Sequence, residues 1–348
     1  MTTPTAGRLR VPGATLHYEV RGSGPLLLLI PGGTGGAASF DGIADDLAAD
    51  HTVVSYDPRG LSRSPLDDPQ ARQEVAQHAD DAFRLLELVA PGASARVAGC
   101  SSGAIVALHL LTAHPERISL VVAHEPPVVE VLPDAAGHRA MLARVQDTFH
   151  REGLMPAAAI FAAALTRPAT SSPDTTTPPG PATPPGSSAP PATTTSPGTA
   201  TPPDTATSPD TATPPDTATS PDTAAPPGSS TPPGTTASAV VAAEAELPPE
   251  AAARVQRTMA DMPYFLGRIV PSFMAYVPDL DRLQALSDRL VLAAGTDSRG
   301  ELPYRPAAFM AERFGTELVH FPGGHTGLST HPAEFGKLLS AKLSERVM

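Results

Sequence analysis

One short segment, residues 99–103, constrains the fold of this chain more than any other. It reads Gly-Cys-Ser-Ser-Gly, a serine with a glycine two positions before it and two positions after it. The apolar residues 95–99 have strand character, and the apolar residues 104–111 are long enough for a buried helix. A sharp strand-to-helix turn leaves no room for side chains at the two glycines and pushes the Ser101 hydroxyl out at the carboxyl edge of a sheet. The pattern favours a nucleophilic serine, and a glycine-rich turn with a chance serine is the alternative.

At two other places an apolar run with strand character leads directly into a loop. Residues 25–30 form a continuous apolar run that enters the glycine-rich loop 31–36. Residues 51–56 form a second run, which enters Asp-Pro-Arg-Gly-Leu-Ser-Arg-Ser at 57–64. A glycine-rich loop, a D-x-R-G-x-G-x-S segment and a serine elbow in this order resemble the α/β-hydrolase superfamily of serine enzymes. Ser62 stands where that segment usually has its second glycine, which we expect to change the loop slightly without affecting the chemistry.

The resemblance implies an α/β-hydrolase fold, with a mostly parallel eight-stranded sheet flanked by helices. It places the core at residues 1–127 and 277–348 and a helical cap region at 128–276. Within the cap, residues 168–238 contain only Pro, Thr, Ala, Ser, Asp and Gly, and from residue 195 they follow a six-residue repeat. Such a segment buries too little apolar surface to offset the entropy of ordering, so we expect a disordered insertion.

The family's triad runs in the order serine, acid, histidine, which the resemblance carries over to this chain. Asp297 follows the apolar strand 289–294, where the seventh strand would deliver an acid. Three histidines follow Asp297. His320 lies inside a strand pattern, His331 precedes Pro332 at the start of the last helix, and His325 lies on a glycine-flanked loop. The sequence therefore favours Ser101, Asp297 and His325 as catalytic residues.

Glu125 is the rival acid. It lies in His-Glu-Pro-Pro at the end of strand 118–123, where some relatives place the carboxylate. Its other interpretation, which the sequence favours, is a structural or pocket-wall residue.

The role of each residue follows from the chemistry. A serine hydroxyl is a poor nucleophile near neutral pH, so His325 must accept its proton and later deliver it to the leaving group. Asp297 would hold the imidazole in the required tautomer. By resemblance, the oxyanion hole consists of the amides of Ser102 and Gly33, with Thr34 as second choice.

Apolar side chains of the cap are candidates for a substrate pocket. Two helices are expected within residues 240–277, and they carry Met259, Met262, Phe265 and Phe273. These side chains could line an apolar pocket beneath the cap or could simply pack the cap onto the core.

Composition excludes several classes of partner. A formal net charge of −12 without any Lys/Arg cluster argues against nucleic acid and against an anionic membrane. A single cysteine allows no disulfide framework, and no stretch has the apolar length of a secretory or membrane-spanning segment, so we expect a cytoplasmic protein with a small-molecule substrate. The oligomeric state stays open. No metal-ligand cluster or dinucleotide fingerprint occurs, so we expect no metal and no cofactor.

The sequence thus predicts a serine hydrolase, esterase-like, that cleaves a small ester, thioester, lactone or related carbonyl substrate through an acyl-serine. Serine rather than aspartate at position 101 argues against the family's haloalkane dehalogenases and epoxide hydrolases. Two alternatives remain, because this fold hosts many activities. One is a cofactor-free haloperoxidase, or perhydrolase, and the other is a ligand-binding receptor with a slow or vestigial triad.

Overall fold

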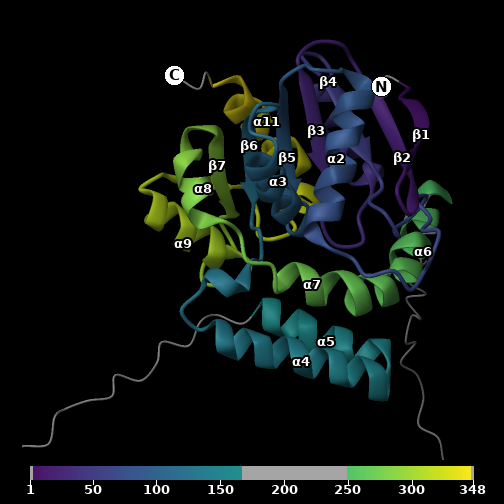
Figure 1. Ribbon diagram of the computed structural model, residues 1–348, viewed down its shortest axis with the longest axis vertical. Helices are drawn as coiled ribbons and strands as arrows, with labels where there is room; N and C mark the ends of the chain where they lie inside the picture. The colour runs from purple at the N-terminus through teal and green to yellow at the C-terminus, as the bar shows by residue number, and fades with distance from the viewer. Residues whose placement is uncertain (1–2, 167–248, 346–348) are drawn as a thin grey trace, which may run out of the picture. The chain divides into compact units, whose positions relative to one another are not determined.

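The strands form one sheet in the order β1-β2-β4-β3-β5-β6-β7-β8 (Figure 1). A computed structural model describes residues 3–166 and 249–345, so the insertion expected at 168–238 lies outside the described residues. β2 pairs antiparallel with β1 and with β4, and all other neighbouring strands are parallel. The expected eight-stranded, mostly parallel sheet is therefore confirmed. The strands are β1 (Thr5–Val11), β2 (Ala14–Arg21), β3 (Leu26–Ile30), β4 (Thr52–Tyr56), β5 (Ala95–Cys100), β6 (Ile118–His124), β7 (Leu290–Gly295) and β8 (Leu318–Phe321).

Helices cover both faces of the sheet, which explains why its central strands are apolar throughout. In β3, Leu26 and Leu28 belong to a core cluster that also contains residues of α2, α3, α8 and α9. Leu27 and Leu29 belong to the cluster on the other face, which contains residues of α1 and α11. The flanking helices are η1 (Ala37–Phe40), α1 (Asp41–Leu47), α2 (Val75–Val89), α3 (Ser102–Ala113), α8 (Leu280–Ala285), η4 (Ser287–Arg289), α9 (Tyr304–Phe314), α10 (Gly327–Thr330) and α11 (Pro332–Ser344).

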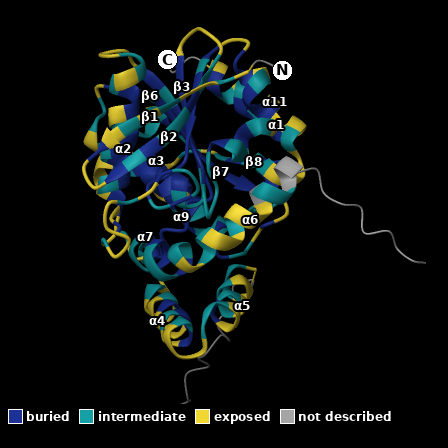
Figure 2. Ribbon diagram, turned by 90° about the vertical axis from the view of Figure 1, so that its right-hand side faces the viewer, coloured by how far each residue is buried: buried dark blue, intermediate teal, exposed yellow. Residues whose placement is uncertain are grey.

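The helices of the predicted cap lie between β6 and α8. They are η2 (Val129–Val131), α4 (Ala135–Glu152), α5 (Leu154–Leu165), α6 (Pro249–Tyr264), the π-helical turn η3 (Phe265–Ile269) and α7 (Val270–Met274). α4 and α5 lie side by side (Figure 1), and their outer faces are exposed (Figure 2). Their inner faces share a core with η3 and α7, in which Val145 of α4 meets Leu266 and Val270. The cap boundaries at residues 128 and 276 stay a prediction.

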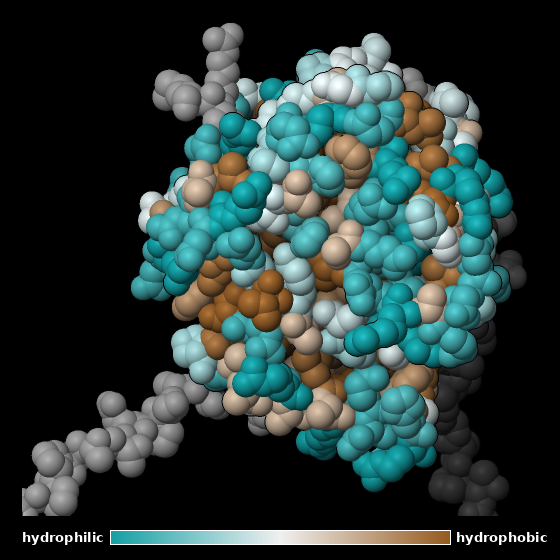
Figure 3. Space-filling model, viewed as in Figure 1, coloured by the Kyte–Doolittle hydropathy of each residue, from teal (hydrophilic) through white to brown (hydrophobic). Residues whose placement is uncertain are grey.

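Apolar side chains form separate patches on the face of the protein shown in Figure 3. On the face shown in Figure 3, hydrophobic areas alternate with larger hydrophilic ones. Within the described residues, no helix combines the length and the apolar character needed to cross a bilayer.

A buried ion pair anchors the segment that follows β4. Arg59 donates two hydrogen bonds to the carboxylate of Asp81 on α2, one of them from Nε at 2.6 Å. The side chains of Arg59 and Asp81 are 2% and 1% exposed. Removing one partner of such a pair leaves a charge buried without compensation, which typically costs several kcal/mol.

Replacing Asp81 with alanine is therefore expected to lower the free energy of unfolding by about 3–5 kcal/mol. The neighbouring Asp80 is a matched control, because it pairs with Arg84 on the exposed face of the same helix. Asp80→Ala should cost less than about 1 kcal/mol. Denaturant unfolding of both variants measures the difference, and equal losses would show that burial does not set the strength of the Arg59 pair.

Candidate active site

The serine elbow has the strained backbone that its two glycines predict. Ser101 lies between β5 and α3 with φ 53° and ψ −121°, a backbone conformation that residues other than glycine rarely adopt. A Cβ atom on Gly99 would lie 2.5 Å from the carbonyl oxygen of Gly103, and one on Gly103 would lie 2.3 Å from that of Ile30. Only glycine fits at either position, so the backbone holds the Ser101 hydroxyl out at the edge of the sheet.

His325 lies against this hydroxyl. Its Nε2 atom is 3.1 Å from Ser101 Oγ, within the range for direct proton transfer. The histidine belongs to the loop after β8, and its side chain is 22% exposed. The predicted pairing of Ser101 with His325 therefore has the required geometry, which neither His320 nor His331 shares: their ring nitrogens contact Tyr304 and Thr330 instead.

Glu125 is the acid that contacts this histidine. Its Oε2 atom lies 2.7 Å from His325 Nδ1, and the carboxylate is fully buried at the carboxyl end of β6. Its backbone has φ +49°, and its N–H donates to the carbonyl of Ala293 in β7. Burial by itself would raise the pKa of Glu125, but hydrogen bonds from His325 and Ser298 outweigh it and hold the pKa below its usual value. The carboxylate thus stays ionised and keeps the histidine proton on Nδ1, which leaves Nε2 free to accept the serine proton.

The prediction that Asp297 is the acid partner of His325 is therefore wrong. Asp297 lies on the loop after β7, as expected, but it is exposed, and its carboxylate forms no hydrogen bond or ion pair with a described side chain. The reason is the direction of the loop. Position 298, not position 297, faces inward there, and the space beside the histidine is filled by Glu125 from the neighbouring strand.

Ser298 is a site residue that sequence reasoning missed. It is fully buried, and its hydroxyl donates to Oε1 of Glu125. The backbone N–H of Gly295 donates to the same oxygen at 2.8 Å. Both carboxylate oxygens of Glu125 are therefore engaged, and the side chain has one orientation. A serine in a surface-loop pattern carries no signal for this role.

The glycine-rich loop after β3 passes directly over the elbow. A Cβ atom on Gly32 would lie 2.4 Å from the carbonyl oxygen of Cys100 and 2.8 Å from Ser101 Cβ. Gly33, Thr34 and Ser102 all line the cavity above Ser101. The Gly33 amide donates to the side-chain oxygen of Ser102 at 3.0 Å. The predicted oxyanion residues thus lie next to Ser101, and their role stays a proposal.

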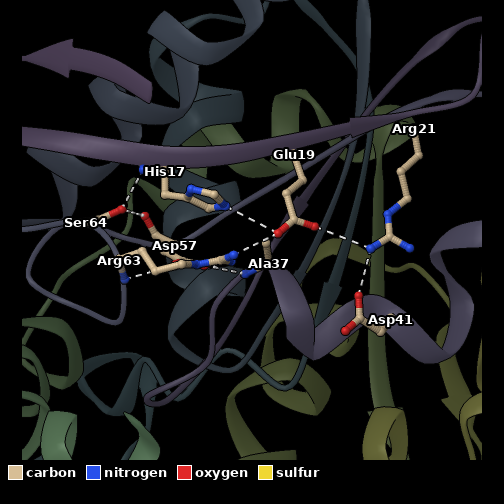
Figure 4. A network of polar contacts seen from close by, with 8 residues as sticks. All are labelled: His17, Glu19, Arg21, Ala37, Asp41, Asp57, Arg63 and Ser64. Atoms are coloured by element: carbon tan, nitrogen blue, oxygen red, sulfur yellow. Dashed lines mark hydrogen bonds and ion pairs between the residues drawn. The ribbon is translucent and has the colours of Figure 1, made fainter. Parts of the chain in front are cut away.

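A charged network holds this loop in place (Figure 4). The buried Asp57 accepts a hydrogen bond from the Ala37 amide, which follows the glycine-rich loop, and two from the Arg63 side chain. Arg63 also donates to Glu19 on β2 at 3.0 Å. Burial alone would raise the pKa of Asp57, but these hydrogen bonds lower it. The network connects the loops after β3 and β4, so Asp57 and Arg63 hold the end of the glycine-rich loop.

Ser62, which replaces the usual glycine, keeps a glycine-like backbone. Its φ is +52°, and its N–H donates to Asp261 of the cap helix α6 at 2.8 Å. The loop therefore retains its course and also contacts the cap.

A cavity of about 420 Å³ lies over Ser101 between the core and the cap helices. Of the candidate pocket residues, Met262, Phe265 and Phe273 line it. Met259 does not, because it lies on the outer side of α6 and is 52% exposed. Among the described lining residues there is no Asp, Glu, Lys or Arg, so the wall is apolar except for hydroxyl groups and His325.

Cys100, next to Ser101, does not offer a second candidate nucleophile. Burial raises the pKa of its thiol to about 12, so the reactive thiolate does not form near neutral pH.

Comparison of the sequence with known proteins finds similarity to hydrolases. A family model described as alpha/beta hydrolase fold matches residues 25–172. The chain is 28% identical to the uncharacterized hydrolase YraK of Bacillus subtilis (strain 168), over 97% of this chain and 96% of that protein. It is 36% identical to a zearalenone hydrolase of Bionectria ochroleuca, over 33% of this chain and 44% of the relative.

A solved structure of a thermophilic esterase from Thermogutta terrifontis superposes with a TM-score of 0.60 at 15% identity and covers 98% of both chains. At that identity the likeness shows the fold alone. The sequence matches and the sheet topology nevertheless agree, and the chain therefore belongs to the α/β-hydrolase superfamily of hydrolases.

Proposed function

We propose that the protein is a serine hydrolase that cleaves a small ester, thioester, lactone or related carbonyl substrate through an acyl-serine intermediate. One observation carries the proposal: a continuous line of contacts leads from Ser101 Oγ to His325 Nε2 at 3.1 Å and from His325 Nδ1 to Glu125 at 2.7 Å. The relatives named above are hydrolases, which supports the reaction class.

Acylation begins with Ser101. Its oxygen attacks the substrate carbonyl carbon while its proton passes to His325 Nε2, and the carbonyl electron pair moves onto the oxygen. Glu125 stabilises the resulting imidazolium through Nδ1 and remains ionised. When the tetrahedral intermediate collapses, the same proton passes from Nε2 to the leaving oxygen or sulfur, and the acyl group stays on Ser101.

Deacylation repeats these steps with water. His325 Nε2 accepts a proton as the water oxygen attacks the acyl carbon, and it then returns the proton to Ser101 Oγ. The acid product leaves, and the resting state is restored.

The cavity favours an uncharged, apolar acyl or leaving group. Aromatic and aliphatic side chains such as Phe161, Phe265 and Leu266 form much of its wall. A buried CH₂ contributes about 0.8 kcal/mol, whereas a charge placed there would lose its hydration without a counter-ion.

A series of p-nitrophenyl esters tests this function. We expect kcat/KM to rise about fourfold per added CH₂ from acetate upward until the cavity is filled. The half-ester of succinic acid should react far more slowly than the pentanoate ester of similar length. A fluorophosphonate probe should label wild-type protein at Ser101 and should not label Ser101→Ala.

Three other results would contradict the proposal. Peracid formation from acetate and hydrogen peroxide, faster than ester hydrolysis, would favour a perhydrolase. Tight binding of small carbonyl compounds without turnover would favour a receptor. A preference for the succinate half-ester would show that the wall described above does not set specificity.

A further inference from the structure

The two amides expected to bind the oxyanion are not equally available. Ser102 is the first residue of α3, so its amide has no partner within the helix and is free to face a ligand. The amide of Gly33 already donates to Ser102 Oγ at 3.0 Å. To bind an oxyanion directly, Gly33 would first have to give up this hydrogen bond.

Gly33 lies in a turn closed by the hydrogen bond from the Gly35 amide to the Gly32 carbonyl at 2.9 Å, and among the described residues the only partner of its own amide is Ser102 Oγ. Its backbone has φ +61°, and a Cβ atom placed on Gly33 would find no atom within 4 Å. No other atom therefore packs against Gly33 on the side where a side chain would project. Losing the bond to Ser102 would release the amide rather than aim it at the substrate.

Ser102 itself borders the site of the reaction. Ser102 lines the catalytic cavity together with Ser101 and Gly33. Its oxygen accepts from Gly33, and among the described residues no acceptor takes up its hydrogen. A hydroxyl that accepts one hydrogen bond becomes a stronger donor of the next.

We propose that the Ser102 side chain is a catalytic residue whose hydroxyl donates directly to the oxyanion, with Gly33 acting through it. The inference rests on the proposed acyl-serine mechanism. As Ser101 Oγ bonds to the carbonyl carbon, the carbonyl electron pair moves onto the oxygen and the Ser101 proton moves to His325. Ser102 keeps its own hydrogen throughout and supplies a hydrogen bond that strengthens as negative charge develops.

The test removes the Ser102 hydroxyl and measures kcat, which should fall if the hydroxyl binds the oxyanion and should stay the same or rise if the Gly33 amide does. If Ser102 is the donor, Ser102→Ala should lower kcat on the best p-nitrophenyl ester by about 10²-fold with little change in KM. Ser102→Thr, which keeps a hydroxyl, should retain most of the rate. Thr52→Ala is the matched control, because Thr52 Oγ1 likewise accepts a glycine amide, that of Gly24, at 3.0 Å and lies outside the site. Its kcat should equal that of wild type.

A second readout separates this role from a structural one. Butylboronic acid forms a tetrahedral adduct with a nucleophilic serine, and its affinity should fall in Ser102→Ala by about the same factor as kcat/KM. The affinity for intact ester, measured on a Ser101→Ala background, should not change when Ser102 is also replaced.

An unchanged or higher kcat in folded Ser102→Ala, with unchanged boronic acid affinity, would overturn the inference and show that the freed Gly33 amide binds the oxyanion. Equal losses in ester affinity and in kcat would also overturn it, in favour of a structural role. Wild-type protein that neither turns over esters nor binds the boronic acid would instead overturn the proposed function, and the inference with it.

Discussion

Replacing Ser101 or His325 with alanine is expected to lower kcat on p-nitrophenyl esters by about 10⁴- to 10⁶-fold, and the double variant should be little worse than either single one. The two side chains act as one unit, since the 3.1 Å contact between them carries the proton in both half-reactions. Stopped-flow and steady-state kinetics on the three variants measure the effect.

Thermal unfolding of the same variants is the control, because both residues line the cavity and neither belongs to the packed core. Losses that simply multiply in the double variant would contradict a shared proton. A Ser101→Ala variant near the wild-type rate would show that hydrolysis occurs elsewhere on the protein.

Glu125→Gln is expected to lower kcat by about 10⁴-fold, whereas Asp297→Asn should have little effect. The glutamine amide would present a donor to His325 Nδ1, which favours the tautomer with the proton on Nε2. That tautomer cannot accept the serine proton. The same ester kinetics on both variants give the comparison.

Asp297→Asn is the matched control, since it removes one negative charge at the end of the adjacent strand. Because Glu125 also bonds Gly295 and Ser298, the variants need a folding readout, for which circular dichroism and the melting temperature serve. Glu125→Asp keeps the charge at a shorter reach and should retain an intermediate rate. A larger loss in Asp297→Asn than in Glu125→Gln would overturn the assignment of the acid.

Much of the architecture could be predicted from local pattern. Residues 25–30 are apolar at every position because β3 is covered on both faces, and the glycines around Ser101 mark positions where a Cβ atom would collide with backbone. The first residues of β1 carry no such apolar pattern. β1 begins at Thr5, because its polar first half gains its structure from the pairing of Thr5 with Val20 and of Gly7 with Tyr18.

Side-chain direction in loops and on cap helices could not be predicted in the same way. Met259 and Met262 are three positions apart on α6, a spacing that fits one helical face, yet only Met262 reaches the cavity. The hydrogen bond of the Ser102 side chain likewise depends on where that side chain points. Its place directly after Ser101 was visible in the sequence, but the contact of its hydroxyl with Gly33 depends on how the glycine-rich loop meets the start of α3.

The sequence by itself indicated the superfamily and the candidate pair Ser101 and His325, because these depend on glycine positions, strand ends and chain order. The acid was decided only by the tertiary structure. Glu125 and Asp297 each follow a buried parallel strand, and β6 and β7 are neighbours, so both carboxylates reach the same edge of the sheet. The two carboxylates differ because the backbones of the two loops differ. The left-handed backbone of Glu125 directs its side chain to His325. In the turn after β7, Ser298 points inward and Asp297 points toward solvent.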